Sequence, residues 1–296
     1  MQTKLLKILL SFFCIYFIWG STYLATKWAF VSFPPFLMTS TRFLMAALIM
    51  AVLRIKHLRY LTFVGIRNAM MIGFLILGIG TGCCMWALQF MDTSLASILV
   101  STEPAVLVFV SWWILGLRPT FMKFVGILLG LIGVYLLSEV DYLWLDRWVI
   151  LGAISIAVAV VSWSFGSVYI KLWTMPKDLL SGVAIQLFSG GMFLLICAMI
   201  AGENTNDIQE NFEWIAFNSW VYLVIFGSVI AYTAFTYLLM ETDPNLVATC
   251  TYVNPVVAIF LGVFLNDEVL TQTVLMASAI MIIGVVLIVT ERKKTS

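Results

Sequence analysis

The sequence predicts an all-α integral membrane protein whose ten transmembrane helices form two inverted repeats of five helices each. Three observations lead to this prediction. Of 296 residues, 62% are hydrophobic and only 10% are charged, whereas a soluble domain carries about 25% charged residues. The apolar residues fall into ten runs of membrane-spanning length. Short segments of the first half also recur in the second half.

A helix needs about 20 mainly apolar residues to cross a hydrocarbon core about 30 Å thick. Ten runs between charged clusters are candidates for such helices: Leu5–Phe33, Phe36–Leu53, Asn68–Met91, Ser94–Leu115, Phe121–Leu137, Trp148–Lys171, Leu180–Ala201, Trp214–Met240, Asn245–Leu265 and Thr273–Thr290. Short polar turns join these spans and leave no room for a soluble domain. The first run is too long for the apolar core of a signal peptide and no small-residue cleavage site follows it, so we interpret it as a span.

The distribution of Lys and Arg predicts the orientation, because cytoplasmic loops of membrane proteins are enriched in both residues. With a cytoplasmic N-terminus, the inside segments hold 13 of these residues and the outside segments hold only Arg147, while Lys27 and Arg42 lie within spans. An odd number of spans would place the basic C-terminal tail outside. We therefore expect a multi-pass protein with both termini in the cytoplasm.

The second half of the sequence is similar to the first half. Segment 92–104 aligns with segment 243–255 at an offset of 151 residues, from an aspartate at the start to a proline at the end. Two residues of the first span recur at an offset of 144 residues: Trp19 as Trp163 and Lys27 as Lys171. We expect one repeat over residues 5–138 and another over residues 148–290. Because five is an odd number of spans, the second repeat is inverted in the membrane, which is a recurrent plan of transporters.

Several motifs resemble those of one known family. They are Trp19-Gly-Ser-Thr-Tyr23, Pro34-Pro35 with Arg42-Phe43, Trp163-Ser-Phe-Gly-Ser-Val-Tyr169 and Tyr252-Val-Asn-Pro-Val-Val-Ala-Ile-Phe-Leu-Gly262. Through these motifs nearly the whole chain resembles the EamA family of drug/metabolite transporters, and within it the YedA-like branch of bacterial inner-membrane proteins. The resemblance implies a carrier of amino acids, amines, other metabolites or drugs in the lipid bilayer of that plasma membrane, with export as the favoured direction. One departure is Gly116-Leu-Arg118, where the family often has Gly-Glu after the fourth span; this argues against a role for a carboxylate there.

Three charged residues within the predicted spans are the first candidates for function, because a charge inside the bilayer costs about 2.5–3.5 kcal/mol. At a rise of about 1.5 Å per residue, Lys27 and Arg42 lie about 9 Å from the outer ends of their spans, and Glu103 about 14 Å. We expect the three to meet around one polar cavity. Arg42 would bind an anionic group of a small-molecule substrate. Glu103 would take up a coupled proton or ion, because burial disfavours the charged carboxylate.

Each of these residues also has a structural interpretation. Arg42 and Glu103 could neutralise each other and brace two helices. Lys27 could extend its amine to the headgroups at the outer surface. The sequence leaves both interpretations open.

Matched positions of the two repeats supply further candidates. Pro104 and Pro255 each remove one backbone hydrogen bond in mid-span. Broken helices are tolerated where they are buried or line a cavity, and the alternative is a packing kink. Trp19 and Trp163 would form aromatic walls for an amphipathic or cationic solute. The predicted substrate-binding residues are Trp19, Arg42, Glu103, Trp163, Gln186, Tyr252 and Asn254.

Absent patterns exclude several classes of function. His57 is the only histidine and the five cysteines show no ligand spacing, so the sequence predicts no metal site, no cofactor and no enzyme. There is no nucleotide-binding loop for ATP, and no clustered basic footprint for nucleic acid. A channel or membrane scaffold remains as the alternative to a secondary transporter that works by alternating access. Gly126-x-x-x-Gly130 predicts close helix packing, either within the chain or in a homodimer.

Overall fold

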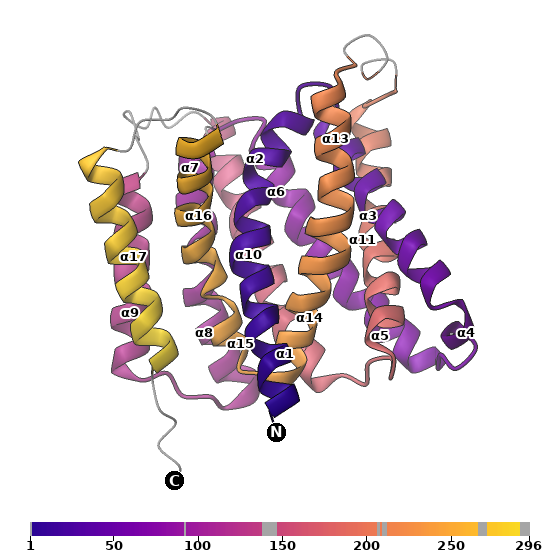
Figure 1. Ribbon diagram of the computed structural model, residues 1–296, viewed down its shortest axis with the longest axis horizontal. Coiled ribbons are helices and arrows are strands. Elements are labelled where there is room, and N and C mark those ends of the chain that lie inside the picture. Colours follow the sequence, from indigo (N-terminus) through magenta and orange to yellow (C-terminus); the bar gives the residue numbers. More distant parts are fainter. Residues whose placement is uncertain are drawn as a thin grey trace.

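The computed structural model describes residues 2–91, 93–137, 147–205, 208, 212–265 and 271–290. Throughout these residues the regular secondary structure is helical, and the helices form one bundle (Figure 1). In chain order they are α1 (Gln2–Phe13), the π-helix η1 (Cys14–Ile18), α2 (Trp19–Ala29), α3 (Pro35–Leu53), α4 (Ile55–Leu58), α5 (Phe63–Gly73), the π-helix η2 (Phe74–Gly80), α6 (Thr81–Ala87), α7 (Thr93–Val100), α8 (Glu103–Leu115), α9 (Phe121–Leu137), α10 (Arg147–Leu172), α11 (Leu179–Ala201), α13 (Trp214–Tyr222), the π-helix η3 (Leu223–Ala231), α14 (Tyr232–Glu241), α15 (Pro244–Val247), α16 (Cys250–Leu265) and α17 (Gln272–Thr290).

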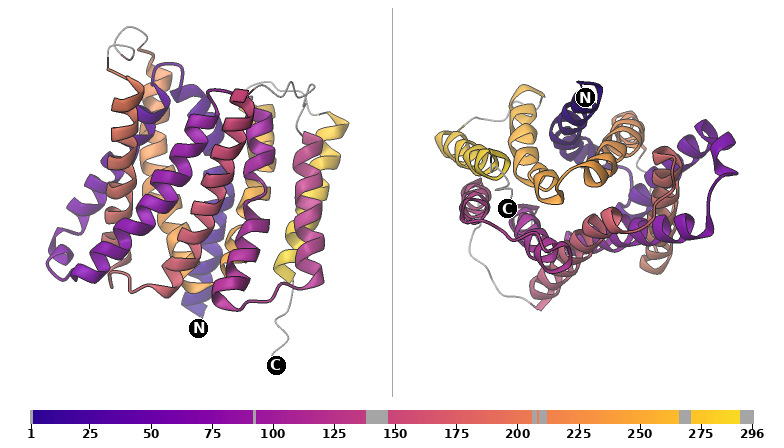
Figure 2. Two further views of the ribbon diagram at one scale, coloured as in Figure 1. Left: turned by 180° about the vertical axis from the view of Figure 1, so that it is seen from behind. Right: turned by 90° about the horizontal axis from the view of Figure 1, so that it is seen from below.

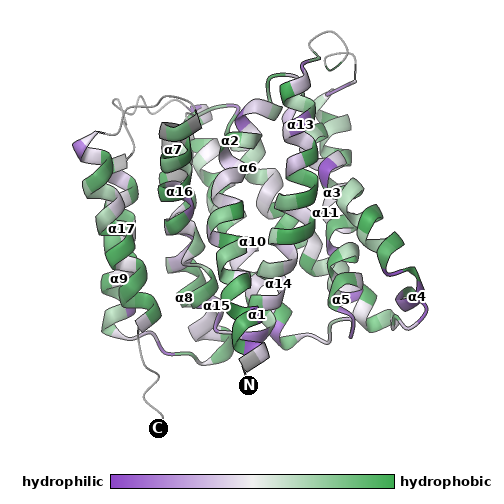
Figure 3. Ribbon diagram, viewed as in Figure 1, coloured by the Kyte–Doolittle hydropathy of each residue, from purple (hydrophilic) through white to green (hydrophobic). Residues whose placement is uncertain are grey.

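Within the described part of the chain, nine helical stretches are long and apolar enough to cross a membrane. The tenth, α9, is a shorter apolar helix of 17 residues, which is at the lower limit for a span. In Figure 3 hydrophobic residues cover most of the length of the helices, and hydrophilic residues gather mainly near their ends. The prediction of an all-α membrane protein with ten helices is therefore confirmed.

The start of α1 and the end of α17 lie at the same face of the bundle, which we call the terminal face (Figures 1 and 2). The short helix α4 and the junction between α14 and α15 also lie at this face. The other end of the bundle is the opposite face. The basic C-terminal tail, Arg292–Lys294, lies outside the described residues.

Side-chain caps determine where two of the helices begin. The predicted third span starts at Asn68, but α5 begins five residues earlier because the hydroxyl of Thr62 accepts a hydrogen bond from the Gly65 amide at 3.2 Å. Asp178 caps α11 in the same way and accepts from the Ser181 amide at 2.9 Å. Such caps satisfy amides that have no partner within the helix.

Helices at corresponding positions of the two predicted repeats pack against each other. The second spans, α3 and α11, contact along their length, and so do the fifth spans, α9 and α17. Figure 2 shows α9 and α17 side by side at one end of the molecule. The sixth span, α10, packs on η2 of the third, while the first span packs on α13 and η3 of the eighth. Each predicted repeat thus lies against the other rather than forming a separate body.

Glycines bring α9 and α17 into close contact. A Cβ atom placed on Gly126 would lie 2.7 Å from the carbonyl oxygen of Gly284, and one on Gly284 would lie 2.6 Å from the carbonyl oxygen of Gly126. A Cβ on Gly130 would meet the ring of Tyr252 at 2.5 Å. Gly126 and Gly130 therefore serve helix packing within the chain. Their spacing gives no support to a homodimer.

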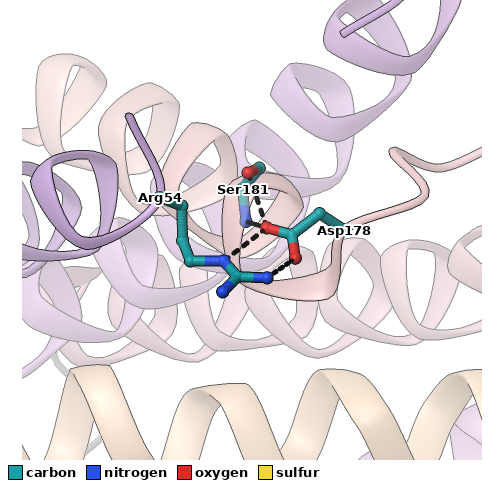
Figure 4. Close-up of polar contacts among 3 residues, drawn as sticks. All are labelled: Arg54, Asp178 and Ser181. Carbon is teal, nitrogen blue, oxygen red and sulfur yellow. Dashed lines mark hydrogen bonds and ion pairs between the residues drawn. The ribbon is translucent and has the colours of Figure 1, made fainter. Parts of the chain in front are cut away.

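An ion pair joins the two predicted repeats at the terminal face (Figure 4). Arg54, directly after α3, donates from Nε to Oδ2 of Asp178 at 3.1 Å and from Nη2 to Oδ1. Asp178 also accepts from the Ser181 hydroxyl at 2.7 Å. Hydrogen bonding from the Arg54 guanidinium holds the pKa of Asp178 well below its usual range. The pair fixes the start of α11 to the end of α3.

Several spans consist of more than one helix. The fourth span breaks between α7 and α8, where Pro104 occupies the first turn of α8. The ninth span breaks between α15 and α16, upstream of its proline, and α16 continues through Pro255. Pro104 therefore lies at the interruption of the fourth span, whereas Pro255 lies inside a continuous helix. The three π-helices, which the sequence did not predict, interrupt the first, third and eighth spans.

Candidate solute site

A cavity of about 290 Å³ lies among these interrupted spans. Its walls come from α2, α3, η2, α6, α10, η3, α14 and α16, together with Val100 at the end of α7 and Glu103 at the start of α8. Most of the predicted site residues are among the lining residues: Trp19, Arg42, Glu103, Trp163 and Asn254. The cavity therefore brings together side chains from both predicted repeats.

Arg42 lines the cavity from α3. Its Nε donates a hydrogen bond to the hydroxyl of Ser228 at 2.7 Å, and its guanidinium lies 5.3 Å from the centre of the Phe43 ring. Ser228 belongs to η3, so a hydroxyl of the second half orients a cation of the first half. In the described structure no ion pair joins Arg42 to a carboxylate. The terminal nitrogens of its guanidinium are the groups that a ligand anion would contact.

Glu103 lines the same cavity and has only 9% of its surface exposed. Its Oε2 accepts a hydrogen bond from the hydroxyl of Thr251 at 2.6 Å. Glu103 is also the first residue of α8. Among the described ion pairs none connects Glu103 with Arg42. The structure therefore does not show the ion pair between Arg42 and Glu103 that the structural interpretation of the sequence would require.

Aromatic rings form the apolar wall of the cavity. The ring of Phe235 lies 4.9 Å from that of Trp19 and 5.9 Å from that of Trp163, and the two tryptophan rings are 6.4 Å apart in an edge-to-face arrangement. Tyr232 stacks on Phe235 at 6.0 Å. Such a cluster offers a large apolar surface next to the charged groups of the cavity.

The π-helices η2 and η3 contribute Leu77, Gly80 and Gly227 to the lining. A π-turn disturbs the regular hydrogen-bond ladder. The indole Nε1 of Trp19 donates a hydrogen bond to the carbonyl oxygen of Gly227 in η3 at 3.1 Å. The hydroxyl of Ser162 donates a hydrogen bond to the carbonyl oxygen of Leu75 in η2 at 2.8 Å. In both cases a side chain from one half binds a π-helix carbonyl of the other half.

Asn254 supplies a second indication of a binding site. It lines the cavity with 5% of its surface exposed, and its Oδ1 has no hydrogen-bond partner in the described structure. Buried polar atoms nearly always have a partner. An unpartnered amide oxygen at a cavity wall is therefore a position where a ligand or a water molecule would donate a hydrogen bond.

Three predicted site residues do not line the cavity. Gln186 is fully buried and accepts a hydrogen bond from the hydroxyl of Tyr232 at 2.7 Å, so it supports a lining residue from behind. Tyr252 is also fully buried, and it packs on Gly130 of α9. Lys27 is exposed in the last turn of α2, so two of the three charges meet at the cavity rather than all three.

Several lining residues were missed by the sequence analysis. Phe235, Tyr232, Thr251 and Cys84 face the cavity, and Ser228 holds Arg42. Ordinary apolar or hydroxyl residues of a transmembrane helix carry no charge or repeat signal. To predict which of them line the cavity, one must know the rotation of each helix about its axis, and this rotation changes at every π-turn.

A second group of contacts lies at the terminal face, around the α14–α15 junction (residues 241–243). Lys123 of α9 lies 3.5 Å from Asp243, and both side chains are largely buried. The ammonium of Lys171, in the last turn of α10, donates a hydrogen bond to the carbonyl oxygen of Thr242. These contacts tie the junction to α9 and α10.

Comparison with known proteins identifies the family. A model of the EamA-like transporter family matches the chain twice, over residues 6–139 and 150–290. The chain belongs to the EamA-like transporter family. The resemblance recognised from the motifs is thus confirmed.

Named relatives of this EamA-like transporter agree with the assignment. It is 34% identical to the "Uncharacterized inner membrane transporter YedA" of Escherichia coli K12, with 96% of this chain and 91% of that protein covered. It is 23% identical to the "Uncharacterized transporter YoaV" of Bacillus subtilis, with 95% and 96% covered. A solved crystal structure superposes with a TM-score of 0.78 at 20% identity and 94% coverage of each chain, which shows the same fold. These findings indicate a membrane transporter and not an enzyme.

Proposed function

We propose that this EamA-like transporter is a secondary transporter that moves a small amphipathic solute with an anionic and a cationic group, such as a free amino acid. The observation that carries the proposal is that Arg42 and Glu103 line one cavity without pairing with each other. Two opposite charges that stay separate in a low-dielectric site favour a ligand that supplies both counter-charges. A simple amine or a drug-like solute with one charge would satisfy only one of them.

The remaining walls suit the rest of such a solute. The guanidinium of Arg42 matches a carboxylate, the carboxylate of Glu103 matches an ammonium group, and the unpartnered Oδ1 of Asn254 accepts a further hydrogen bond. The rings of Trp19 and Phe235 would pack on an apolar side chain. A volume of about 290 Å³ is at the small end for ligand pockets and fits a single metabolite rather than a polymer.

Transport in this proposal proceeds by alternating access around a fixed site. Two inverted repeats that enclose a mid-membrane site are typical of carriers of this kind. The distribution of Lys and Arg supports a terminal face that lies in the cytoplasm. Export is the direction that the family resemblance favours. Glu103 is the proposed coupling group, because it is the buried carboxyl group of the cavity. Its uptake and release of a proton would be coupled to the movement of the solute.

Counterflow in proteoliposomes tests this function. Vesicles loaded with unlabelled leucine, methionine or phenylalanine should accumulate the labelled compound, and the initial rate should saturate. Arg42→Ala should abolish accumulation, whereas Arg59→Ala, which removes an exposed arginine outside the cavity, should leave it unchanged. Flux that never saturates, with conductance, would indicate the alternative function of a channel. Absence of saturable flux for every amino acid and amine tested would refute the proposal.

A further inference from the structure

Two lysines that match in the repeats have different environments in this structure. Lys171, in the last turn of α10, binds the carbonyl oxygen of Thr242 after the end of α14 at the terminal face. Lys27, its match at an offset of 144 residues, lies in the last turn of α2 toward the opposite face. Its side chain is exposed, and within the described residues it has neither a hydrogen bond nor an ion pair. One matched lysine is therefore engaged and the other is not.

The helices that carry these lysines show the same asymmetry. Toward the terminal face, α10 contacts α14, and Lys171 bridges their ends. The corresponding helices of the first repeat are α2 and α6. Here the cavity lies between them, with Tyr23 of α2 on one wall and Cys84 and Met85 of α6 on another. Tyr23, the lining residue of α2 nearest the opposite face, is 51% exposed.

A matched acceptor for Lys27 is present after α6. Thr242 corresponds at the 151-residue offset to Met91, which is described and buried. Carbonyl groups at the C-terminal end of a helix lack partners within the helix and attract a cation. Met91 lies four residues beyond the last residue of α6, in the turn that follows the helix. By the sequence correspondence, its carbonyl is the group at which Lys27 would make the contact that Lys171 makes with Thr242.

We propose that Lys27 is the gate residue of the opposite face. When the cavity closes there, its ammonium donates a hydrogen bond to the carbonyl oxygen of Met91, as Lys171 does to Thr242 at the terminal face. The two contacts alternate, and each holds one end of the cavity closed. This inference rests on the proposed function, because it concerns the exchange between the two states of the carrier.

The two gates differ in strength. At the terminal face the Lys123–Asp243 pair reinforces Lys171. Val274 occupies the position that matches Lys123 at the 151-residue offset, so the first repeat's gate has no such second lysine. Lys27 is thus the main cation of the proposed opposite-face gate, whereas the terminal face has contacts from both Lys171 and Lys123.

Modification of Cys84 tests the proposal without any solute. Cys84 lines the cavity on α6. A variant that keeps this cysteine and replaces Cys14, Cys83, Cys197 and Cys250 by alanine is reacted with the impermeant reagent trimethylammonium-ethyl methanethiosulfonate. Right-side-out and inverted vesicles are both used, so that the face of access is measured.

We expect the rate of Cys84 modification to depend on the contacts at both faces. Removing the terminal contacts with Lys171→Gln and Lys123→Gln should lower the modification rate from the opposite face about fivefold, because the population shifts toward closure there. Adding Lys27→Gln should restore the rate, and Lys27→Arg should not. Lys56→Gln, an exposed lysine at the terminal face, is the matched control and should change nothing.

Two results would overturn the gate while leaving the proposed function intact. One is a modification rate that the terminal variants do not change. The other is a lowered rate that Lys27→Gln fails to restore, as expected if Lys27 only contacts headgroups. Failure of the proposed function is recognised separately, because it is an absence of saturable solute flux in the parent protein.

Discussion

The two charged residues of the cavity are held by hydroxyl groups rather than by each other. Arg42 and Glu103 both belong to the first half of the chain, and their partners Ser228 and Thr251 belong to the second half. A hydroxyl satisfies part of the hydrogen-bonding capacity of a charged group without cancelling its charge. The charges therefore stay available to a ligand, and their geometry depends on how the two halves are packed.

Arg42→Lys tests whether the guanidinium acts through its shape or only through its charge. Lysine keeps the charge but loses the planar fork that binds a carboxylate through two nitrogens. We expect the affinity for the transported zwitterion to fall about tenfold or more. Titration calorimetry of the purified protein measures this, with Arg59→Lys as the control. An affinity unchanged by Arg42→Lys would mean that Arg42 acts through its charge alone and not through the shape of its guanidinium.

Glu103→Gln tests the coupling role. The amide is nearly isosteric with the carboxyl group but exchanges no proton, so a pH gradient should no longer drive accumulation of solute. Counterflow without a gradient should continue, although with weaker binding of the ammonium group. Both rates are measured in the same proteoliposomes. Gradient-driven accumulation that survives Glu103→Gln would exclude Glu103 as the coupling group.

At the scale of single elements, close helix contacts explain the most constrained positions. The backbones of α9 and α17 touch at Gly126 and Gly284, where a Cβ atom on either residue would overlap the carbonyl oxygen of the other. The lipid offers no hydrophobic driving force between helices, so such close van der Waals packing is a main source of their association.

Gly126→Leu should therefore destabilise the protein by about 1–3 kcal/mol, because it forces α9 and α17 apart. Thermal unfolding in detergent measures the loss as a lower melting temperature. Leu128→Met, on the exposed side of the same helix, should leave it unchanged. A normal melting temperature together with loss of a chemically cross-linked dimer would instead place Gly126 at a contact between two copies.

At the scale of the whole molecule, the sequence predicted the number of spans, their membrane-crossing length and the residues that carry charge. These follow from composition and from the cost of burying a charge, which act on each residue separately. It could not predict that Tyr252 packs on Gly130 or that Lys27 stays outside the cavity. Those placements depend on the rotation of each helix about its axis, which the π-helices shift and which hydropathy does not record.

The Arg54–Asp178 pair is one of the contacts that hold the two halves together, and its effect should depend on pH. The folded-state pKa of Asp178 lies below its unfolded value, so the pair stabilises the fold above about pH 4, and the contribution is lost as the pH falls toward the folded-state pKa. Asp178→Asn keeps a good helix cap but removes the charge. It should lower the melting temperature at neutral pH by the equivalent of about 1 kcal/mol or less, since both side chains are partly exposed.

Melting curves of both proteins from about pH 7 to about pH 3 check this. The difference between them should shrink as the pH falls below about 4, because the unfolded parent protein then takes up a proton at Asp178 while the folded protein keeps the carboxylate charged. A difference that stays constant over this range would mean that Asp178 acts only as a cap.

The π-helices η2 and η3 end at matched positions of the two predicted repeats. They end at Gly80 and Ala231, which are separated by 151 residues, the same distance that separates Pro104 from Pro255. A half-gene that already had one extra residue at this position, and that then duplicated and fused, would account for both. The irregular turn is then older than the division of labour between the halves, and close relatives should retain it even where the charged residues beside it have diverged.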